Sequence, residues 1–409
     1  MPGYPTILGM PRVEHGLLSG NVLPDYDGGS TVNLMATLIG ARGGTSPHPP
    51  LAGLDPAPLR EVDTLLYMVL DGLGLHQLQR HLDNGLGKRF FARHPHSQLT
   101  TVFPATTAAA VTTFDTGCSP TEHGILSWYL HLPDLGVLST VLRTTSRIGS
   151  PLLPEGFDLR SYYAVPSYVE TMQVHRGLLS YGDIPEVPFG QVGTRWSDRR
   201  SYLDLPGMVD TVEGFATEKP GEKRFGYVYW PRYDGLCHEH GIGHEEVAHH
   251  FEELDVALAD LESRLAGQSV AICILADHGL VDVDAERCID VSTLEGFMDC
   301  LAAAPGGDQR QLNCFVRPRY EKRFLELVER ELGDACTCIP GEFLLDSGAF
   351  GPGTPHPELR RRLGDYVLLC KDGYSLIHTP PGLDPMVMPG SHGGMSQPEI
   401  EIPLFVLRP

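Results

Sequence analysis

Short, continuous apolar runs recur along the chain, and each is bounded by glycine or polar residues. The clearest are Thr64–Leu70, Phe225–Trp230 and Ser269–Ala276. A short apolar run without polar alternation is typical of a strand buried on both faces of a parallel sheet. Leu99–Phe103 and Pro403–Leu407 are two further strand candidates. The hydrophobic pattern therefore predicts a central, mostly parallel sheet.

Segments with helical character lie between these runs. Glu245–Leu265 repeats apolar residues at helical spacing, with acidic residues facing outward. Thr107–Thr116 is rich in alanine and ends at a glycine, and a shorter helix is expected near residues 75–82. Ser30 is placed to cap a helix over Thr31–Gly40. Together, the strands and helices predict an α/β fold in which helices flank the sheet.

The pattern changes in the later part of the chain. Leu312–Arg317 predicts a strand and Tyr320–Leu332 an amphipathic helix. Tyr366–Cys370 and Tyr374–Ile377 flank a Lys-Asp-Gly turn signal, which predicts a β-hairpin. We therefore divide the chain into an N-terminal arm and helix (1–60), a main α/β core (61–282), an inserted α+β cap module (283–385) and a return to the core (386–409).

Acidic and imidazole side chains follow the predicted central strands. Asp71 follows the first strand, Asp234 follows the strand that ends at Trp230, and Asp277 and His278 follow the third. In open α/β sheets, ligands bind at the carboxyl ends of the strands, so these side chains are expected to converge. One Asp-Gly pair alone is a common turn. Three such strand ends favour a metal cluster.

Three further residues extend this candidate cluster. His238 lies four residues after Asp234, so a helical turn would place both on one face. His392 lies in a glycine-rich loop. Thr107 lies at the start of the alanine-rich helix, where a hydroxyl can serve as an N-cap. A hydroxyl that binds a divalent cation at this position would instead become a nucleophile.

These motifs resemble the alkaline phosphatase superfamily, and within it the type I phosphodiesterase/nucleotide pyrophosphatase branch. They occur in the order of that family and span about 64 to 409. The motifs are Asp71-Gly72, Phe103-Pro104-x-x-Thr107, Thr116-Gly117, Pro120-x-x-His123-Gly124-Ile125, Asp234-x-x-x-His238, Asp277-His278-Gly279 and His392-Gly393.

The resemblance implies an alkaline phosphatase-like fold with two divalent metal ions, Zn²⁺ being expected and Mn²⁺ the alternative. It also implies a two-step hydrolysis, in which Thr107 attacks phosphorus and water then hydrolyses the phosphothreonine. Thr107 is preferred to Thr106 because it lies ten residues before Gly117, as in the family pattern. The ligand sets implied are Asp71, Thr107, Asp277 and His278 for one ion, and Asp234, His238 and His392 for the other.

One departure from the family pattern leaves alternatives open. The pattern has an Asn three residues after the nucleophile, and this chain has Ala110. Backbone N–H groups near Ala108 could replace its contacts with phosphoryl oxygens. The leading hypothesis is hydrolysis of a small phosphodiester or phosphoanhydride. A phosphomonoesterase or cofactor-independent phosphomutase, and a non-catalytic metal-binding scaffold, are the alternatives. Specificity is expected to depend on residues 125–225 and 283–385.

Composition narrows the class of substrate. Lys and Arg number 31 against 52 Asp and Glu, a formal net charge of −21. This balance argues against a nucleic acid polymer or an anionic membrane surface as partner, because both bind clustered basic residues. Two divalent ions would nevertheless make the site locally positive. We therefore expect a small-molecule phosphate ester as the substrate.

The cysteines and the hydropathy indicate a compartment. The 9 cysteines are scattered, and several lie in apolar strand-like runs, as expected for reduced thiols. Residues 1–20 do not resemble an export signal, and no apolar run approaches the roughly 20 residues of a membrane span. The expectation is a cytoplasmic protein without a membrane segment, of undetermined oligomeric state. Four other histidines are expected to support the site or lie at the surface, namely His76, His123, His240 and His244.

Overall fold

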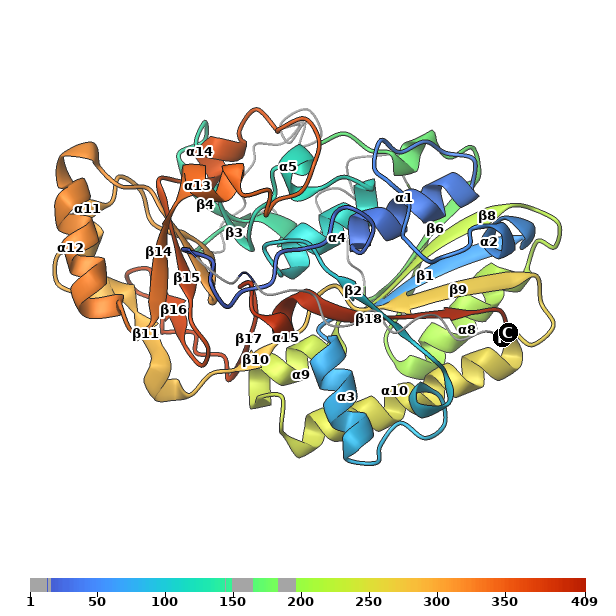
Figure 1. The fold of residues 1–409 in the computed structure, drawn as a ribbon. Helices are drawn as coiled ribbons and strands as arrows, with labels where there is room; N and C mark the ends of the chain where they lie inside the picture. Colours follow the sequence, from blue (N-terminus) through green and yellow to red (C-terminus); the bar gives the residue numbers. More distant parts are fainter. Residues whose placement is uncertain (1–12, 14–15, 144, 149–164, 183–195) are drawn as a thin grey trace.

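A seven-stranded sheet forms the centre of the molecule (Figure 1). The computed structural model describes residues 13, 16–143, 145–148, 165–182 and 196–409. The strand order is β2-β18-β9-β1-β8-β6-β7, and only β18 runs antiparallel to its neighbours. The predicted α/β fold with a mostly parallel central sheet is confirmed. The strands are β1 (Thr64–Leu70), β2 (Ser97–Thr100), β6 (His175–Tyr181), β7 (Asp198–Tyr202), β8 (Arg224–Trp230), β9 (Val270–Leu275) and β18 (Glu401–Leu407).

Helices cover both faces of this sheet (Figure 1). On one face α1 packs against α4, and on the other α10 packs against α8 and α9. The predicted helix ends are largely confirmed. The Asn33 side chain accepts a hydrogen bond from Ser30 N before α1, and Gly117 ends α4 with φ 77°. The helices are α1 (Thr31–Ala41), α2 (Ala57–Glu61), α3 (Leu75–Asp83), α4 (Thr107–Thr116), α5 (Pro120–His123), α8 (Leu205–Thr217), α9 (Arg232–His240), α10 (Glu245–Arg264) and α15 (Gln397–Ile400).

A second, antiparallel sheet stands beside the first, on the left in Figure 1. Its order is β14-β15-β13-β12-β3-β4-β5. Helices α11 (Phe297–Cys300), α12 (Glu321–Leu332), α13 (Gly341–Asp346) and α14 (Leu359–Leu363) accompany it. The strands are β3 (Tyr129–Leu132), β4 (Val137–Thr140), β5 (Thr145–Ser146), β12 (Gly306–Asp308), β13 (Gln311–Cys314), β14 (Cys336–Pro340) and β15 (Tyr366–Cys370).

The second sheet is built from two distant parts of the chain. Strands β3 to β5 come from residues 129–146, within the range assigned above to the main core, and the others come from residues 306–370. The boundary between core and cap at 282/283 therefore stays a prediction. The predicted N-terminal arm falls partly on residues 1–12 and 14–15, which lie outside the described residues.

The hairpin predicted from Tyr366–Cys370 and Tyr374–Ile377 is wrong. The turn between them forms, since Tyr374 N donates to Lys371 O at 3.2 Å. However, β15 pairs with β13 on one edge and β14 on the other, so it offers no free edge. Strand β16 (Ser375–Ile377) instead pairs in parallel with β11 (Cys288–Asp290).

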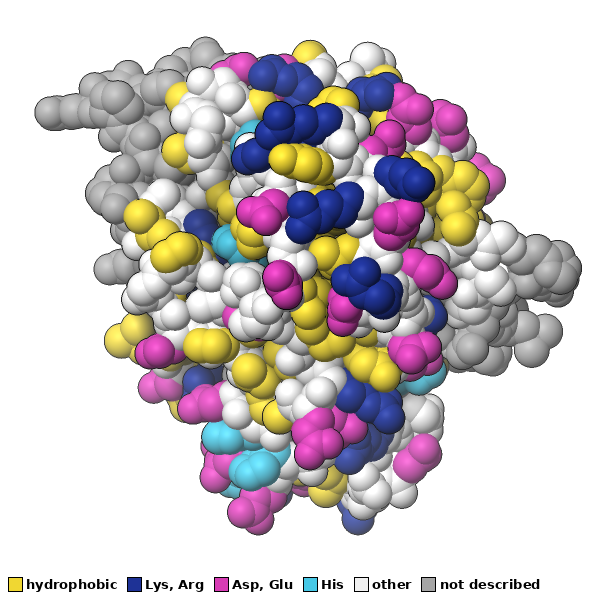
Figure 2. All heavy atoms as spheres, turned by 90° about the vertical axis from the view of Figure 1, so that its left-hand side faces the viewer, with side chains coloured by type: hydrophobic (Ala, Val, Ile, Leu, Met, Phe, Trp, Pro, Cys, Tyr) yellow, Lys and Arg dark blue, Asp and Glu magenta, His cyan; other side chains and the backbone are white. Residues whose placement is uncertain are grey.

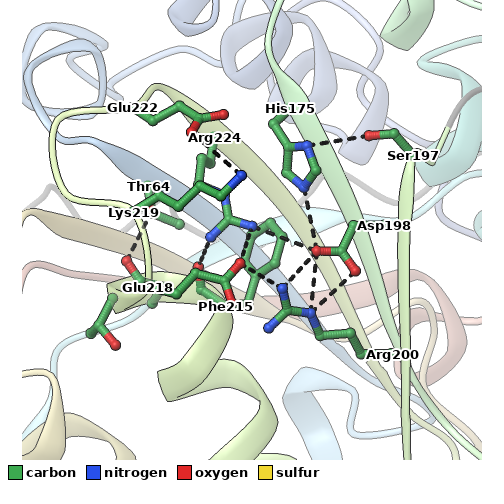
Figure 3. Close-up of polar contacts among 12 residues, drawn as sticks. Thr64, His175, Ser197, Asp198, Arg200, Phe215, Glu218, Lys219, Glu222 and Arg224 are labelled. Carbon is green, nitrogen blue, oxygen red and sulfur yellow. Dashed lines mark hydrogen bonds and ion pairs between the residues drawn. The ribbon is translucent and has the colours of Figure 1, made fainter.

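The amino ends of three central strands are tied together by charged side chains (Figure 3). Arg224 opens β8 and stacks over the ring of Phe215 at 3.9 Å, while its Nη2 lies 2.8 Å from Glu218 Oε1. Asp198, which opens β7, accepts from Arg200 Nη2 at 2.7 Å, and its Oδ2 lies 3.3 Å from Nε2 of His175, the first residue of β6. The starts of neighbouring parallel strands converge, which brings these charges together. The network lies at the end of the sheet opposite to the site described below.

One side of the molecule carries interspersed charges of both signs (Figure 2). This is the side on which α11 and α12 lie in Figure 1. Ion pairs on α12 illustrate the pattern, with Lys322 Nζ 3.7 Å from Glu326 Oε1 and Arg330 Nε 2.7 Å from Glu331 Oε1. Within the described residues, no helix is long and apolar enough to cross a membrane.

Candidate metal centre

The predicted ligands lie where the central strands end. Asp71 directly follows β1, and Asp277 and His278 follow β9. Asp234 and His238 lie on α9, which begins just after β8. A Cβ atom on Gly72 would come within 2.9 Å of Asp234 Cβ, so the absence of a side chain there lets the turn after β1 lie against α9.

The loop that carries His392 returns to this edge. Strand β17 (Gly390–Ser391) pairs with β10 (Val281–Asp282), a few residues beyond His278. The rings of His278 and His392 stack with centroids 3.8 Å apart, and the rings of His238 and His392 lie 5.0 Å apart. All six predicted Asp and His ligands are therefore gathered in one place.

Two groups of side chains are close enough to hold one ion each. The first is Asp71, Asp277 and His278, and the second is Asp234, His278 and His392. His278 Nε2 lies 3.4 Å from Asp71 Oδ1 and 3.4 Å from Asp277 Oδ2. It thus belongs to both groups, whereas the sequence assigned it to the first alone.

His238, predicted as a ligand of the second ion, lies outside both groups but contacts Asp234 of the second group. Its Nε2 lies 3.1 Å from Asp234 Oδ2, and His392 Nε2 lies 3.8 Å from Asp234 Oδ1. The i, i+4 spacing on α9 places the two side chains on one helix face, as predicted.

Each aspartate presents one carboxylate oxygen without a hydrogen-bond partner. These buried atoms are Asp71 Oδ1, Asp234 Oδ1 and Asp277 Oδ2. The other oxygen of Asp277 accepts from the backbone N–H groups of Gly72 and His278, each at 3.0 Å. Buried carboxylate oxygens are costly without a partner, so three of them facing one another fit a cation site.

The histidines are oriented by backbone carbonyls. His238 Nδ1 lies 2.7 Å from Gly390 O, His278 Nδ1 3.1 Å from Gly279 O, and His392 Nδ1 3.0 Å from Ala105 O. Each Nδ1–H therefore donates to a carbonyl, which directs Nε2 at the carboxylates. Such support is characteristic of histidines that bind metal ions.

The electrostatics of the cluster also fit a cation. Burial, followed by the charges of Asp277 and Asp234, raises the pKa of Asp71 well above its ordinary value. Burial and the neighbouring His278 hold the pKa of His392 well below its ordinary value, so its imidazole is neutral and able to bind a metal ion. A divalent ion would relieve the repulsion among the carboxylates.

The hydroxyl of Thr107 reaches the cluster. Its Oγ1 lies 3.1 Å from His278 Nε2 at the first turn of α4. The hydroxyl of Thr106 is engaged elsewhere, since it donates to Asp308 Oδ1 at 3.0 Å. Of the two threonines, Thr107 is therefore the one whose hydroxyl lies at the cluster. Thr107 is also the one that the spacing to Gly117 favours as the nucleophile.

The position that replaces the family asparagine lies in the hydrophobic core. Ala110 is fully buried and belongs to the main core cluster, as does Ala109. Ala105 and Ala108 belong to the second cluster, which packs under the second sheet. A side chain at residue 110 is thus surrounded by apolar groups of the core.

Three residues near the centre carry no sequence motif. Tyr229 Oη donates to Asp71 Oδ2, and Thr101 Oγ1 donates to Asp277 O. Asp308 accepts from Thr106 and from Trp128 N at 3.2 Å, and burial raises its pKa to about 6. Tyr229 has a weak signal, because it lies next to the end of an apolar strand. Asp308 has no sequence signal, because its position near the metal centre depends on the pairing of β12 in the second sheet.

The other histidines are absent from both groups, in the part of the chain that the structure describes. His76 lies 3.2 Å from Glu401 and His123 3.3 Å from Thr113 Oγ1. His240 and His244 stack with ring centroids 4.6 Å apart.

Fold and site together define an α/β protein with a candidate two-metal centre at the carboxyl edge of its sheet. The family model for type I phosphodiesterase / nucleotide pyrophosphatase matches residues 65–394. The chain therefore belongs to this family of phosphoric ester hydrolases, whose members depend on divalent metal ions. A sequence search of curated proteins gave no match.

Solved structures show the same fold. Human ectonucleotide pyrophosphatase/phosphodiesterase 5 is 16% identical, with 84% of this chain and 87% of that chain covered and a TM-score of 0.62. The murine protein is 16% identical, with 83% of this chain and 87% of that chain covered and a TM-score of 0.58. Phosphonoacetate hydrolase from Sinorhizobium meliloti, solved with phosphonoformate, is 17% identical, with 85% of this chain and 90% of that chain covered and a TM-score of 0.58. At these identities the likeness extends to the fold alone.

Proposed function

We propose that this protein hydrolyses a small phosphodiester or phosphoanhydride through a phosphothreonine intermediate on Thr107. The observation that carries the proposal is the position of Thr107 Oγ1, 3.1 Å from the histidine that both candidate metal groups share. Two solved relatives support a small substrate. An inactive variant of murine ectonucleotide pyrophosphatase/phosphodiesterase 5, with one threonine replaced by alanine, binds AMP, and phosphonoacetate hydrolase binds phosphonoacetate.

The residues suggest how the steps divide. In the first step a bond forms between Thr107 Oγ1 and phosphorus, while the bond to the leaving oxygen breaks. Water then cleaves the phosphothreonine and restores the hydroxyl. Two divalent ions on the Asp and His ligands would lower the pKa of the hydroxyl and neutralise the phosphoryl oxygens. N and O ligands suit Zn²⁺, with Mn²⁺ as the alternative.

The amino end of α4 would contribute to binding the phosphoryl group. Its first-turn N–H groups, such as that of Ala108, have no acceptor within the helix. They lie beside Thr107 at the positive end of the helix dipole, an arrangement that favours an anion. The family pattern has an asparagine at the position of Ala110. The N–H groups would make the contacts with phosphoryl oxygens that this asparagine makes in the family pattern.

Substitution of Thr107 tests the proposal. Thr107→Ala should reduce turnover of bis(4-nitrophenyl) phosphate by about 10⁴-fold or more, because the nucleophile is removed. Thr107→Ser is the matched control, because it retains a hydroxyl and should retain measurable activity. Metal content by elemental analysis should stay at two ions in both variants, and mass spectrometry of quenched wild-type protein should find phosphate on Thr107. Full activity of Thr107→Ala would overturn the proposal.

A substrate comparison separates the remaining possibilities. The protein should hydrolyse bis(4-nitrophenyl) phosphate faster than 4-nitrophenyl phosphate, measured as kcat/KM with Zn²⁺ and with Mn²⁺. A preference for the monoester would indicate a phosphomonoesterase. Two bound ions with no turnover of either ester would indicate the non-catalytic scaffold.

A further inference from the structure

A cavity of about 260 Å³ lies beside the metal centre, at the inner edge of the second sheet. Its lining comes from Tyr129 on β3, from Arg147 after β5, from residues 305–309 and from residues 376–386. We call it the Arg147 cavity. The lining thus combines parts of the two segments, 125–225 and 283–385, in which specificity was expected to reside.

Residues that line this cavity also contact the chain neighbours of the metal-centre residues. Asp308 lines the cavity, and its carboxylate accepts from Thr106, the neighbour of Thr107. A Cβ atom on Gly393, the neighbour of His392, would come within 2.6 Å of Asp308 Cβ. Ser391 Oγ, on the other side of His392, donates to Gln309 Oε1 at 3.2 Å. The cavity therefore lies next to the segments that carry Thr107 and His392.

The walls of the Arg147 cavity are largely apolar. Leu312, Leu376, Ile377 and Pro380 are buried and line it. An apolar cavity of roughly 150 Å³ is large enough to hold benzene. The Arg147 cavity therefore has room for one aromatic ring or a short chain, but is smaller than the roughly 300–1,000 Å³ typical of sites for drug-sized ligands.

One wall carries the guanidinium of Arg147. Arg147 stacks over the ring of Tyr129 at 3.6 Å, and its Nη2 lies 3.5 Å from His378 O. Among the described residues, no carboxylate forms an ion pair with it. Burial lowers the pKa of Arg147, as expected for a guanidinium partly removed from water, but the group stays charged.

The two acids of the lining, Asp308 and Asp384, form no ion pair with Arg147 in the described part of the chain. Asp308 is the buried acid of the lining, and its oxygens are engaged by Thr106 and the backbone of Trp128. Asp384 is exposed. The Nδ1 atom of His378 is buried and has no hydrogen-bond partner within the described structure. Arg147 would thus gain from an acceptor that enters with the ligand, and His378 Nδ1 offers a further polar contact.

We infer that the Arg147 cavity binds the organic group of the phosphate ester, and that this group is a single ring or short chain that ends in a carboxylate. The inference rests on the proposed function, since it assigns the part of the substrate beyond the reacting phosphate. A planar carboxylate matches the two-pronged donor geometry of a guanidinium. The apolar walls would take the ring or chain, and Arg147 its anionic end.

The test compares two symmetrical chromogenic diesters, bis(4-nitrophenyl) phosphate and bis(3-carboxy-4-nitrophenyl) phosphate. In a symmetrical ester either organic group can enter the cavity, so the result does not depend on the orientation of the substrate. The measured quantity is the ratio of kcat/KM for the carboxylated ester to that for the neutral one. Comparing this ratio between variants cancels the difference in intrinsic reactivity.

Arg147→Met should lower this ratio by about tenfold or more, the usual loss when a charge-assisted hydrogen bond is removed. Arg147→Lys should recover part of the lost ratio, because lysine keeps the positive charge but lacks the two-pronged donor geometry of the guanidinium. Arg143→Met is the matched control. Arg143 also stacks on an aromatic ring, at 5.8 Å from the centroid of Trp128, but it is exposed and does not line the cavity. Its ratio should equal that of the wild type.

The outcomes distinguish this inference from the proposed function. An unchanged ratio in Arg147→Met, with both esters hydrolysed, would overturn the inference and leave the function standing. An equal drop of the ratio in Arg143→Met would also overturn it, because a general effect of surface charge would then suffice. Absence of turnover on both esters by the metal-loaded wild type would instead count against the proposed function.

Discussion

At the scale of single residues, the centre consists of side chains whose charges do not balance without a cation. Asp71, Asp234 and Asp277 each present a buried carboxylate oxygen without a partner. The neighbouring imidazoles are held with Nε2 directed at them. Binding energy for a divalent ion is therefore coupled to the stability of the fold.

Metal removal should destabilise the protein as well as inactivate it. A ligand at about 1,000 times its Kd contributes roughly 4 kcal/mol to the folded state. Dialysis against a chelator should therefore lower Tm by several degrees, and Zn²⁺ or Mn²⁺ should restore it. Calorimetry of the stripped and reloaded protein measures the change. The same Tm in both forms would show that the aspartates hold no structural ion.

A second prediction at this scale concerns the second ion. Asp234 contacts both His238 and His392, so Asp234→Ala removes the one residue that joins them. Metal content should fall from two ions to one, and kcat for bis(4-nitrophenyl) phosphate by about 10²-fold or more, as for loss of a group that stabilises transition-state charge. Retention of both ions would contradict the assignment of Asp234.

At the scale of elements, histidine 81 of α3 links three helices. His81 stacks on Phe251 of α10 at 4.2 Å, and its Nε2 lies 2.8 Å from Tyr233 Oη of α9. Burial, with a smaller contribution from Arg80, lowers the pKa of His81 to about 4. The folded protein therefore keeps this group neutral, while the unfolded chain protonates it near pH 6.5.

This difference predicts a specific loss of stability in acid. Between about pH 6.5 and 4 the unfolded chain binds one more proton at this site, so stability falls as the pH falls. The loss at the lower limit is roughly 3 kcal/mol. His81→Gln keeps a polar partner for Tyr233 but cannot titrate. Its free energy of unfolding, measured with urea across this range, should fall by about 1.4 kcal/mol less per pH unit, the slope that one proton contributes. Parallel curves would refute the assignment.

At the scale of the whole molecule, one buried ion pair joins the second sheet to the loop of the metal centre. Arg310 Nε, between β12 and β13, lies 3.3 Å from Glu399 Oε1 in α15, and both side chains are fully buried. The same oxygen accepts from Gly394 N at 2.8 Å, two residues beyond His392. A second Arg310 nitrogen, Nη1, donates to Lys371 O at 2.6 Å.

Breaking this pair should affect stability and metal binding together. Arg310→Met leaves Glu399 buried without its partner, at a cost of about 3–5 kcal/mol. Addition of Glu399→Gln should recover part of the loss, since it removes the unpaired charge. Urea unfolding measures the first effect, and the Zn²⁺ content after dialysis the second. A loss below about 1 kcal/mol in Arg310→Met would contradict this role of the pair.

Local signals were sufficient for much of the fold. The strand Thr64–Leu70 and the helix Thr107–Thr116 were predicted with their observed ends, because a buried strand and a glycine-terminated helix each have a short-range pattern. Strands β6 and β7 were missed. Their sequences mix charged and apolar residues, and these charges find distant partners, since Asp198 pairs with His175 of β6 and Arg200 with Glu218 at the end of α8.

The sequence by itself determined five of the seven central strands, the family motifs and the side chains that meet at the strand ends. These follow from local hydrophobic pattern and from the common direction of parallel strands. Tertiary structure alone decided that His278 belongs to both candidate metal groups and that β16 pairs with β11 instead of β15. It also decided that Asp308 and Arg147 lie beside the centre. Their neighbours are far away in the chain, and nothing in local propensity encodes contacts across that distance.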